Sequence, residues 1–181
     1  MIANAARPGR VFAGAITLAA ALILGASVAR AGDVLAPGDP FPAWTLRDQT
    51  GTAVSSSSLA GKRYLLWFYP RAMTPGCTAE ATALRGKYPE LREAGVEVVG
   101  VSFDQPEANA AFVAGEKLPF RLLSDDGTLA VAVGAATASD QAARRISYLV
   151  GADGKVLRVY TSVNPATHAG EVLADANAGG R

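Results

Sequence analysis

The chain of 181 residues contains one cysteine, Cys77, and one histidine, His168. A single cysteine excludes a disulfide within the chain, and the absence of a Cys-x-x-Cys pair argues against a disulfide oxidoreductase. A single histidine cannot build a metal site. We expect His168 to lie on the surface of the last helix. Cys77 is either a reactive thiol or an inert buried one.

Charge is also scarce, because acidic and basic side chains make up only 18% of the chain. They nearly balance, with 17 basic and 16 acidic residues. A protein that binds nucleic acid or anionic lipid usually carries a strongly basic patch, which this composition does not indicate. The sequence therefore favours a small molecule or another protein as partner and argues against nucleic acid.

Residues 1–31 have the pattern of a secretory signal peptide. Arg7 and Arg10 precede a long apolar stretch, and Ala29–Ala31 fits the small-x-small pattern of a cleavage site. We expect cleavage after this site and export to the periplasm. The mature protein is then one domain, residues 32–181, without stable membrane contact. The alternative is an uncleaved anchor, since the apolar stretch approaches the roughly 20 residues that a membrane span needs.

One stretch of the remaining chain combines a buried strand with the start of a helix. Tyr64–Tyr69 is a continuous aromatic and aliphatic run, typical of a buried strand, and Pro70 should end it. Thr74 has the residue type of a helix N-cap, and Pro75 suits the first helical position. Cys77 then lies in the first turn, where unpaired N–H groups and the helix dipole favour a thiolate.

Strands and helices alternate along the rest of the chain, and a hairpin follows them. The expected strands are 44–46, 53–55, 64–69, 96–102, 121–124, 146–150 and 156–160, and the expected helices are 75–94, 104–115, 128–133 and 165–176. Asp104 and Glu107 have the spacing of a capping box at the start of the second helix. This order predicts an α/β, thioredoxin-like fold with a mixed central sheet and helices on both faces.

The run FYPRAMTPGCTAE, which contains the strand end and the helix start, resembles the active-site signature of the peroxiredoxins. The segments VVGVSFDQPE, LPFRLLSDDG and RRISYLVGADGKV follow in the order of the same family. The TPGCTxE run is similar to the bacterioferritin comigratory protein, or peroxiredoxin Q, branch. The resemblance extends from about Leu35 to Ala176. It implies a thiol peroxidase that works without metal, flavin or haem.

The resemblance also implies roles for individual residues. Cys77 is the expected nucleophile that attacks the peroxide bond. Thr74 can direct its hydroxyl at the thiolate or at the bound peroxide; a plain N-cap is the alternative, and the two roles are compatible. Pro70 can limit access of water to the thiolate, although a simple strand terminator would look the same.

A positive charge near the sulfur is also expected. The family pattern of RRISYLV aligns the catalytic arginine on Arg145, which leaves Arg144 as a solvated neighbour. Glu80, three residues after Cys77, could orient that arginine from the same helix or could be an ordinary surface carboxylate.

Many members of this branch carry a second, resolving cysteine at the position that Thr82 occupies here. Without it, the sulfenic acid of Cys77 must be reduced by an external thiol of the thioredoxin, glutaredoxin or glutathione type. The alternative is a disulfide between two copies of the chain. Apart from such a bond, we expect the protein to be a monomer or a weak homodimer. A different function, a non-catalytic peroxide sensor or thiol-relay protein that signals through oxidation of Cys77, also fits the sequence.

Overall fold

Parallel strands lie at the centre of the sheet and antiparallel strands at its edges. The computed structural model describes Met1 and residues 32–179, so all of the expected signal peptide except Met1 lies outside the described residues. Within them, seven strands form one sheet in the order β2-β1-β5-β4-β3-β6-β7. The strands are β1 Thr45–Asp48, β2 Ala53–Ser55, β3 Arg63–Phe68, β4 Val96–Ser102, β5 Arg121–Ser124, β6 Ile146–Val150 and β7 Val156–Tyr160.

The central strand β3 pairs in parallel with β4 and antiparallel with β6. Strand β4 pairs in parallel with β5, and the remaining pairs are antiparallel. Parallel strands in a covered sheet are buried on both faces, which explains why β3 is a continuous apolar run instead of an alternating one. The expected mixed sheet is confirmed.

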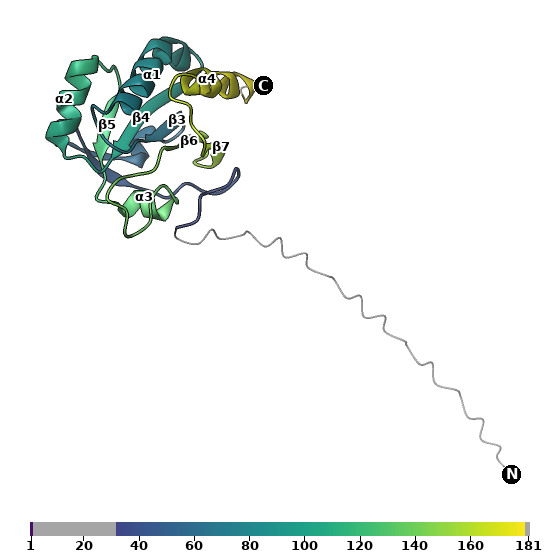
Figure 1. Ribbon diagram of the computed structural model, residues 1–181. Helices are drawn as coiled ribbons and strands as arrows, with labels where there is room; N and C mark the ends of the chain where they lie inside the picture. The colour runs from purple at the N-terminus through teal and green to yellow at the C-terminus, as the bar shows by residue number, and fades with distance from the viewer. Residues whose placement is uncertain (2–31, 180–181) are drawn as a thin grey trace.

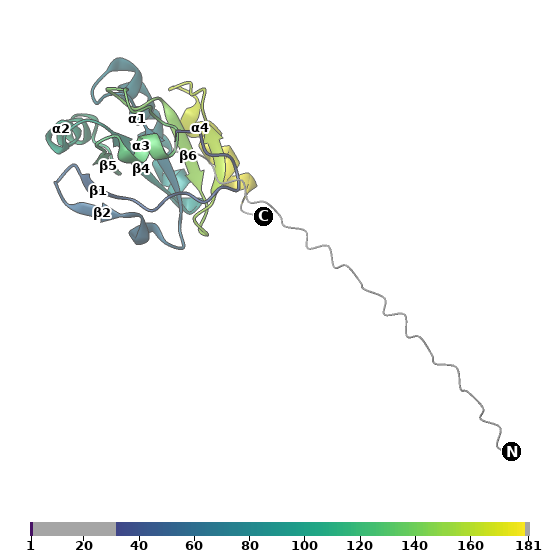
Figure 2. The same ribbon diagram turned by 90° about the horizontal axis from the view of Figure 1, so that it is seen from below.

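Helices cover both faces of this sheet. They are α1 Pro75–Glu93, α2 Pro106–Glu116, α3 Thr128–Ala132 and α4 His168–Ala178, with a short 3-10 turn η1 at Ser56–Leu59. Helices α1, α2 and α4 pack on one face, and α3 lies on the other (Figure 1). Seen from below, α3 lies in front of the strands (Figure 2). The thioredoxin-like arrangement expected from the sequence is confirmed.

Alternate residues of β3 point to opposite faces and divide the core in two. Leu65 and Trp67 pack with Cys77 beneath α1, α2 and α4. Leu66 and Phe68 pack in the second cluster, which includes residues of α3. Cys77 therefore lies in the core on the face that three helices cover.

Two helices begin later than the sequence predicts. Helix α2 starts at Pro106 with Gln105 as its N-cap, and no side chain caps it, so the capping box of Asp104 and Glu107 is wrong. Helix α4 starts at His168 instead of residue 165, because 164–167 form a separate turn. In the described part of the chain, no helix is both long and apolar enough to cross a membrane.

Candidate active site around Cys77

The site lies where the chain leaves the carboxyl end of β3. The Tyr69 N–H still donates to the carbonyl of Val101 on β4, at 3.0 Å, after which Pro70 opens the loop to α1. Thr74 is the N-cap residue of α1, with extended backbone, and Pro75 is the first helical residue. Cys77 consequently sits in the first turn, with its side chain fully buried.

A guanidinium from a distant part of the chain reaches the cysteine. Arg145, just before β6, donates from Nη2 to Cys77 Sγ at 3.4 Å. Its Nη1 donates to Oε2 of Glu80, one helical turn after Cys77. Arg144 instead points outward and pairs with Asp140 at 3.6 Å. The structure thus brings together Cys77, Glu80 and Arg145.

Charge and burial reinforce one another in this group. Burial alone would lower the pKa of Arg145, but its hydrogen bonds and charge interactions with Cys77 and Glu80 raise that pKa above the ordinary value. Burial raises the pKa of the Glu80 carboxyl, and the hydrogen bond and charge of Arg145 oppose this rise. The guanidinium is permanently charged, so it offsets part of the cost of burying a negative charge on Glu80, and it places a positive charge against Cys77 Sγ.

Gly76 leaves room for this guanidinium. A Cβ placed on Gly76 would lie 3.2 Å from Nη2 of Arg145, which is tighter than an ordinary contact. Because Nη2 is the atom that donates to Cys77, any side chain at position 76 would press on the contact with sulfur. The glycine in TPGC is explained by this close approach, since its backbone is ordinary helix.

Thr74 and Pro70 lie in the loop before α1, but neither makes a hydrogen bond to the cysteine. The Thr74 hydroxyl donates to the carbonyl of Arg71 at 3.0 Å, and its side chain does not cap α1. Both residues are half-buried. In this geometry the Thr74 hydroxyl must rotate away from Arg71 to reach a bound substrate.

A carboxylate that the sequence assigns to helix capping holds the active-site loop instead. Asp104 Oδ2 accepts a hydrogen bond from the backbone N–H of Ala72 at 2.8 Å. Tyr69, at the start of the loop, donates from its hydroxyl to Asn109 on α2 at 2.6 Å. Directly after Ala72, Met73 adopts a left-handed backbone, with φ of 61°, and exposes its side chain. Strain of this kind in a non-glycine residue is typical of functional loops.

His168 is the second residue that sequence reasoning misplaced. Its side chain is fully buried, not on the surface, and its Nε2 lies 3.0 Å from Ser147 Oγ and 3.8 Å from Glu80 Oε1. The helical pattern of the C-terminal segment could have shown the inward position, because Val172 and Ala176 follow at spacings of four. The position next to Glu80 depends on packing between α4 and α1, which no local pattern contains.

Thr82 lies further along α1, on the side that faces α2. Its hydroxyl is 3.5 Å from Glu116 Oε2, at the end of α2. Cys77 is a free cysteine. Among the described residues, no group of three or more His, Cys, Asp and Glu side chains could hold a metal ion.

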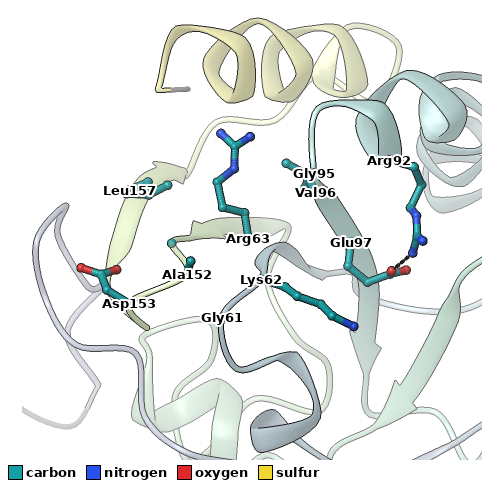
Figure 3. Close-up of a pocket in the computed structure, with 11 residues that line it drawn as sticks. Gly61, Lys62, Arg63, Arg92, Gly95, Val96, Glu97, Ala152, Asp153 and Leu157 are labelled. Atoms are coloured by element: carbon teal, nitrogen blue, oxygen red, sulfur yellow. Dashed lines mark hydrogen bonds and ion pairs between the residues drawn. The ribbon is translucent and has the colours of Figure 1, made fainter. Parts of the chain in front are cut away.

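The hollow drawn in Figure 3 lies away from the site. It has a volume of about 620 Å³ and is lined by residues at the starts of β3 and β4, among them Lys62, Arg63 and Glu97. Arg63 there donates to the carbonyls of Ala94 and Ala176, near the ends of α1 and α4. Cys77 follows the opposite, carboxyl end of β3, so this hollow is not part of the reactive centre.

Comparison with known proteins shows the family. The model of the AhpC/TSA family matches residues 37–159. Peroxiredoxin Bcp of Escherichia coli (strain K12) is 40% identical over 146 residues, which is 77% of this chain and 94% of that protein. Peroxidoxin BcpB of Mycobacterium tuberculosis has a similar structure, with a TM-score of 0.73, 34% identity and coverage of 78% of this chain and 96% of that one.

A third similar protein has a known peroxide reduction activity. The bacterioferritin comigratory protein of Xanthomonas campestris, a protein with alkyl peroxide reduction activity, aligns with a TM-score of 0.71 and 30% identity. The alignment covers 76% of this chain and 92% of that one.

The chain belongs to the AhpC/TSA family, and its thioredoxin-like fold is that of a peroxiredoxin, an enzyme of the thiol peroxidase class. Its relatives, which include peroxiredoxin Q proteins, place it on the Bcp and peroxiredoxin Q branch. The family and branch expected from the sequence are confirmed.

Proposed function

We propose that the chain reduces hydrogen peroxide and small organic hydroperoxides, with Cys77 as its one redox-active group and an external thiol as reductant. The observation that carries this proposal is the contact of Arg145 with both Cys77 and the buried Glu80. It holds a positive charge beside the sulfur, which carries the negative charge when the attack on a peroxide begins. The alkyl peroxide reduction of the Xanthomonas campestris relative supports the inclusion of organic hydroperoxides.

In the first half-reaction, the thiolate of Cys77 attacks the terminal oxygen of the peroxide. A sulfur–oxygen bond forms, the oxygen–oxygen bond breaks, and the leaving oxygen takes a proton and departs as water or an alcohol. Arg145 stabilises the negative charge as it moves from sulfur to the leaving oxygen. The hydroxyl of Thr74 donates a hydrogen bond to the bound peroxide, and Pro70 limits the access of water to the sulfur.

In the second half-reaction, the sulfenic acid is reduced from outside. An external thiol gives up its proton and attacks the sulfur of Cys77 as a thiolate. A sulfur–sulfur bond forms in a mixed disulfide, the sulfur–oxygen bond breaks, and the hydroxide takes up that proton and leaves as water. A second thiol then displaces Cys77 as thiolate and carries away the disulfide. Thioredoxin, glutaredoxin and glutathione are the classes of reductant that this chemistry accepts, and the sequence, which has Thr82 where a resolving cysteine could stand, supports this one-cysteine route.

A steady-state peroxide assay with each reductant in turn tests the proposal. We expect the enzyme to consume many equivalents of peroxide, and Cys77→Ser to consume none while remaining folded. Consumption of a single equivalent, followed by a stable mixed disulfide, would support the sensor or relay function instead. A disulfide between two copies through Cys77 would appear as a covalent dimer on a non-reducing gel and would contradict the external-thiol route. Full activity of Cys77→Ser would refute the peroxidase chemistry proposed for this residue.

We further propose export of the protein, on the sequence pattern of residues 1–31 alone. N-terminal sequencing of the protein from a periplasmic fraction should then begin at Gly32. A chain that keeps its first residues and sediments with membranes would support an anchor instead.

A further inference from the structure

His168 is a buried titratable residue that the proposed chemistry does not use. It opens α4, near the C-terminus, and its ring turns inward against the edge of Tyr160, with 4.9 Å between the ring centroids. Its side chain is fully buried, in a part of the core that includes no other histidine. A buried polar ring costs free energy unless its nitrogen atoms have partners, so the contacts that it makes decide its role.

Those contacts lead to the reactive cysteine through two residues. His168 Nε2 lies 3.0 Å from Ser147 Oγ and 3.8 Å from Oε1 of Glu80. Oε2 of Glu80 accepts from Arg145, whereas Oε1 has no hydrogen-bond partner within the described residues. Glu80 therefore stands between the imidazole and the guanidinium, and the guanidinium contacts Cys77.

The neutral ring has one N–H, and the surroundings decide which nitrogen carries it. Burial lowers the pKa of His168 to about 4, with the charge of Arg145 acting in the same direction and that of Glu171 opposing it. Nδ1 has no hydrogen-bond partner in the described part of the chain, whereas Nε2 faces a hydroxyl and a carboxylate oxygen. A proton on Nε2 finds acceptors and a proton on Nδ1 finds none, which favours the Nε2–H form.

We infer that His168 is a positioning residue for the peroxidase site: its imidazole, fixed by the hydrogen bond to Ser147, packs 3.8 Å from the second oxygen of Glu80, and Glu80 in turn keeps Arg145 on Cys77. The inference rests on the proposed roles of Cys77 and Arg145. It extends the site from the loop before α1 to the start of α4. A carboxylate that is bound to a guanidinium through one oxygen and packed against a buried imidazole at the other has little room to rotate, so the guanidinium that it binds stays in one orientation.

The test compares His168→Leu, which removes the N–H, with His168→Gln, which returns an amide N–H near the position of Nε2. Three quantities are measured for each: the rate constant for peroxide, the pH midpoint of thiolate formation at Cys77, and the free energy of unfolding. We expect His168→Leu to lower the peroxide rate constant roughly tenfold and to raise the thiolate midpoint, because Arg145 loses its fixed orientation. His168→Gln should recover most of both effects.

A matched control separates positioning from general loosening of α4. Val172→Ala removes buried apolar atoms from the same helix, at a side chain with no polar group that could bond to Glu80 or Arg145. It should lower the free energy of unfolding and leave the thiolate midpoint unchanged. An equal shift of the midpoint in Val172→Ala and His168→Leu would overturn the inference.

A double-mutant cycle gives the decisive readout. In a Glu80→Gln background, His168→Leu should have little further effect on the peroxide rate constant, because the path through Glu80 is already broken. Full additivity of the two changes would contradict the inference. If His168→Leu does not fold, His168→Met, which also lacks the N–H, takes its place in the same cycle, with the same two outcomes. Activity that persists in Cys77→Ser would refute the proposed function, whereas an unaffected His168→Leu would refute only the role of the histidine.

Discussion

A guanidinium presents several N–H donors in one plane, and Arg145 uses two of them on different partners. One nitrogen contacts the sulfur of Cys77 and the other the carboxylate of Glu80. A lysine ammonium has no such fork, so it could satisfy one partner only by leaving the other. Arg144 has the same side chain, but it lies exposed beside Asp140 and cannot serve both partners.

We therefore expect Arg145→Ala to lower the rate constant for peroxide roughly 100-fold or more, because a preorganised donor to the reacting atoms is lost. Arg145→Lys should recover only part of that loss. Single-turnover reaction of the reduced enzyme with peroxide measures both variants. Arg144→Ala is the matched control and should react at the normal rate. An effect of equal size at both positions would contradict the geometry.

Gly76 offers a test in which stability and activity should change in different directions. Gly76→Ala adds a better helix former to α1, worth up to about 1 kcal/mol of folding free energy. The added Cβ would meet Nη2 of Arg145 at 3.2 Å and displace it by a few tenths of an ångström. We expect a free energy of unfolding that is unchanged or higher, with a peroxide rate constant lowered roughly tenfold.

Chemical denaturation and single-turnover kinetics on the same Gly76→Ala sample check this expectation. Gly86→Ala, an exposed position on the same helix with nothing within reach of an added Cβ, is the control for helix propensity alone. Its peroxide rate should not change. Normal reactivity of Gly76→Ala would show that the glycine does not protect the arginine.

At the level of single residues, the sequence identified the members of the site that lie in a local motif. Cys77 and Glu80 share one helix, and Arg145 precedes a recognisable strand. Asp104 and His168 were misplaced for a common reason. Each looks like an ordinary helix-end residue, and its actual hydrogen-bond partner, Ala72 or Ser147, comes from a remote part of the chain.

Helix α1 carries both the reactive cysteine and Thr82, five residues later. Five residues of helix correspond to about 7.5 Å along the axis and about 140° around it, so the two side chains point apart. A disulfide requires Cα atoms within roughly 7 Å and converging Cβ atoms. A cysteine at position 82 could therefore bond to Cys77 only if the first turns of α1 unwound.

The start of α1 is suited to such unwinding, since Thr74 does not cap it by its side chain and the first turn holds no acidic residue. We expect Thr82→Cys, after one equivalent of peroxide, to form a disulfide within the chain and to lose part of its helical circular dichroism. Peptide mapping under non-reducing conditions measures the bond. Gly86→Cys, exposed on the same helix, should form no such bond. A helix that stays closed in oxidised Thr82→Cys would mean that the reductant must reach a buried sulfur by another path.

Strands were easier to predict than helix ends. The apolar runs of β4 and β6 gave their bounds, because a strand buried in a sheet has sharp changes of polarity at its ends. The bounds of β5 and β7 followed from the turn residues beside them. Helices α2 and α4 begin two or three residues later than predicted, where turns precede them. The mixed sheet with helices on both faces came from the alternation of elements, whereas the strand order and the side-chain contacts between α4 and α1 needed the folded chain.

On the scale of the whole molecule, the buried polar group that joins α1, α4 and the strand β6 links stability to pH. His168 has a pKa of about 4 in the folded protein, lowered chiefly by burial, and an ordinary value of 6.5 when unfolded. Between these two values the unfolded chain binds a proton that the folded chain does not. The free energy of unfolding must therefore fall as the pH drops through this window.

Other groups facing the histidine modify this dependence. Burial raises the pKa of Glu80, which makes the folded chain hold a proton more tightly and acts in the opposite direction. Tyr160, in contact with the ring, has a pKa raised by burial and stays neutral throughout, as does Ser147. Glu171 opposes the shift of the histidine and Arg145 supports it. The contribution of His168 is isolated only by comparison with a variant that cannot take up a proton at this position.

His168→Gln is that variant, because it keeps an amide N–H and has no titratable group. The free energy of unfolding of the unchanged protein, relative to that of His168→Gln, should fall by about 3 kcal/mol between pH 7 and pH 4. Each pKa unit corresponds to about 1.4 kcal/mol. Urea denaturation at several pH values across this range measures it. A difference that stays constant with pH would mean that the folded protein accepts a proton on His168 as readily as the unfolded chain does. In that case the imidazole would be a cation beside Arg145, and Glu80 would lie between two positive charges instead of pairing with one.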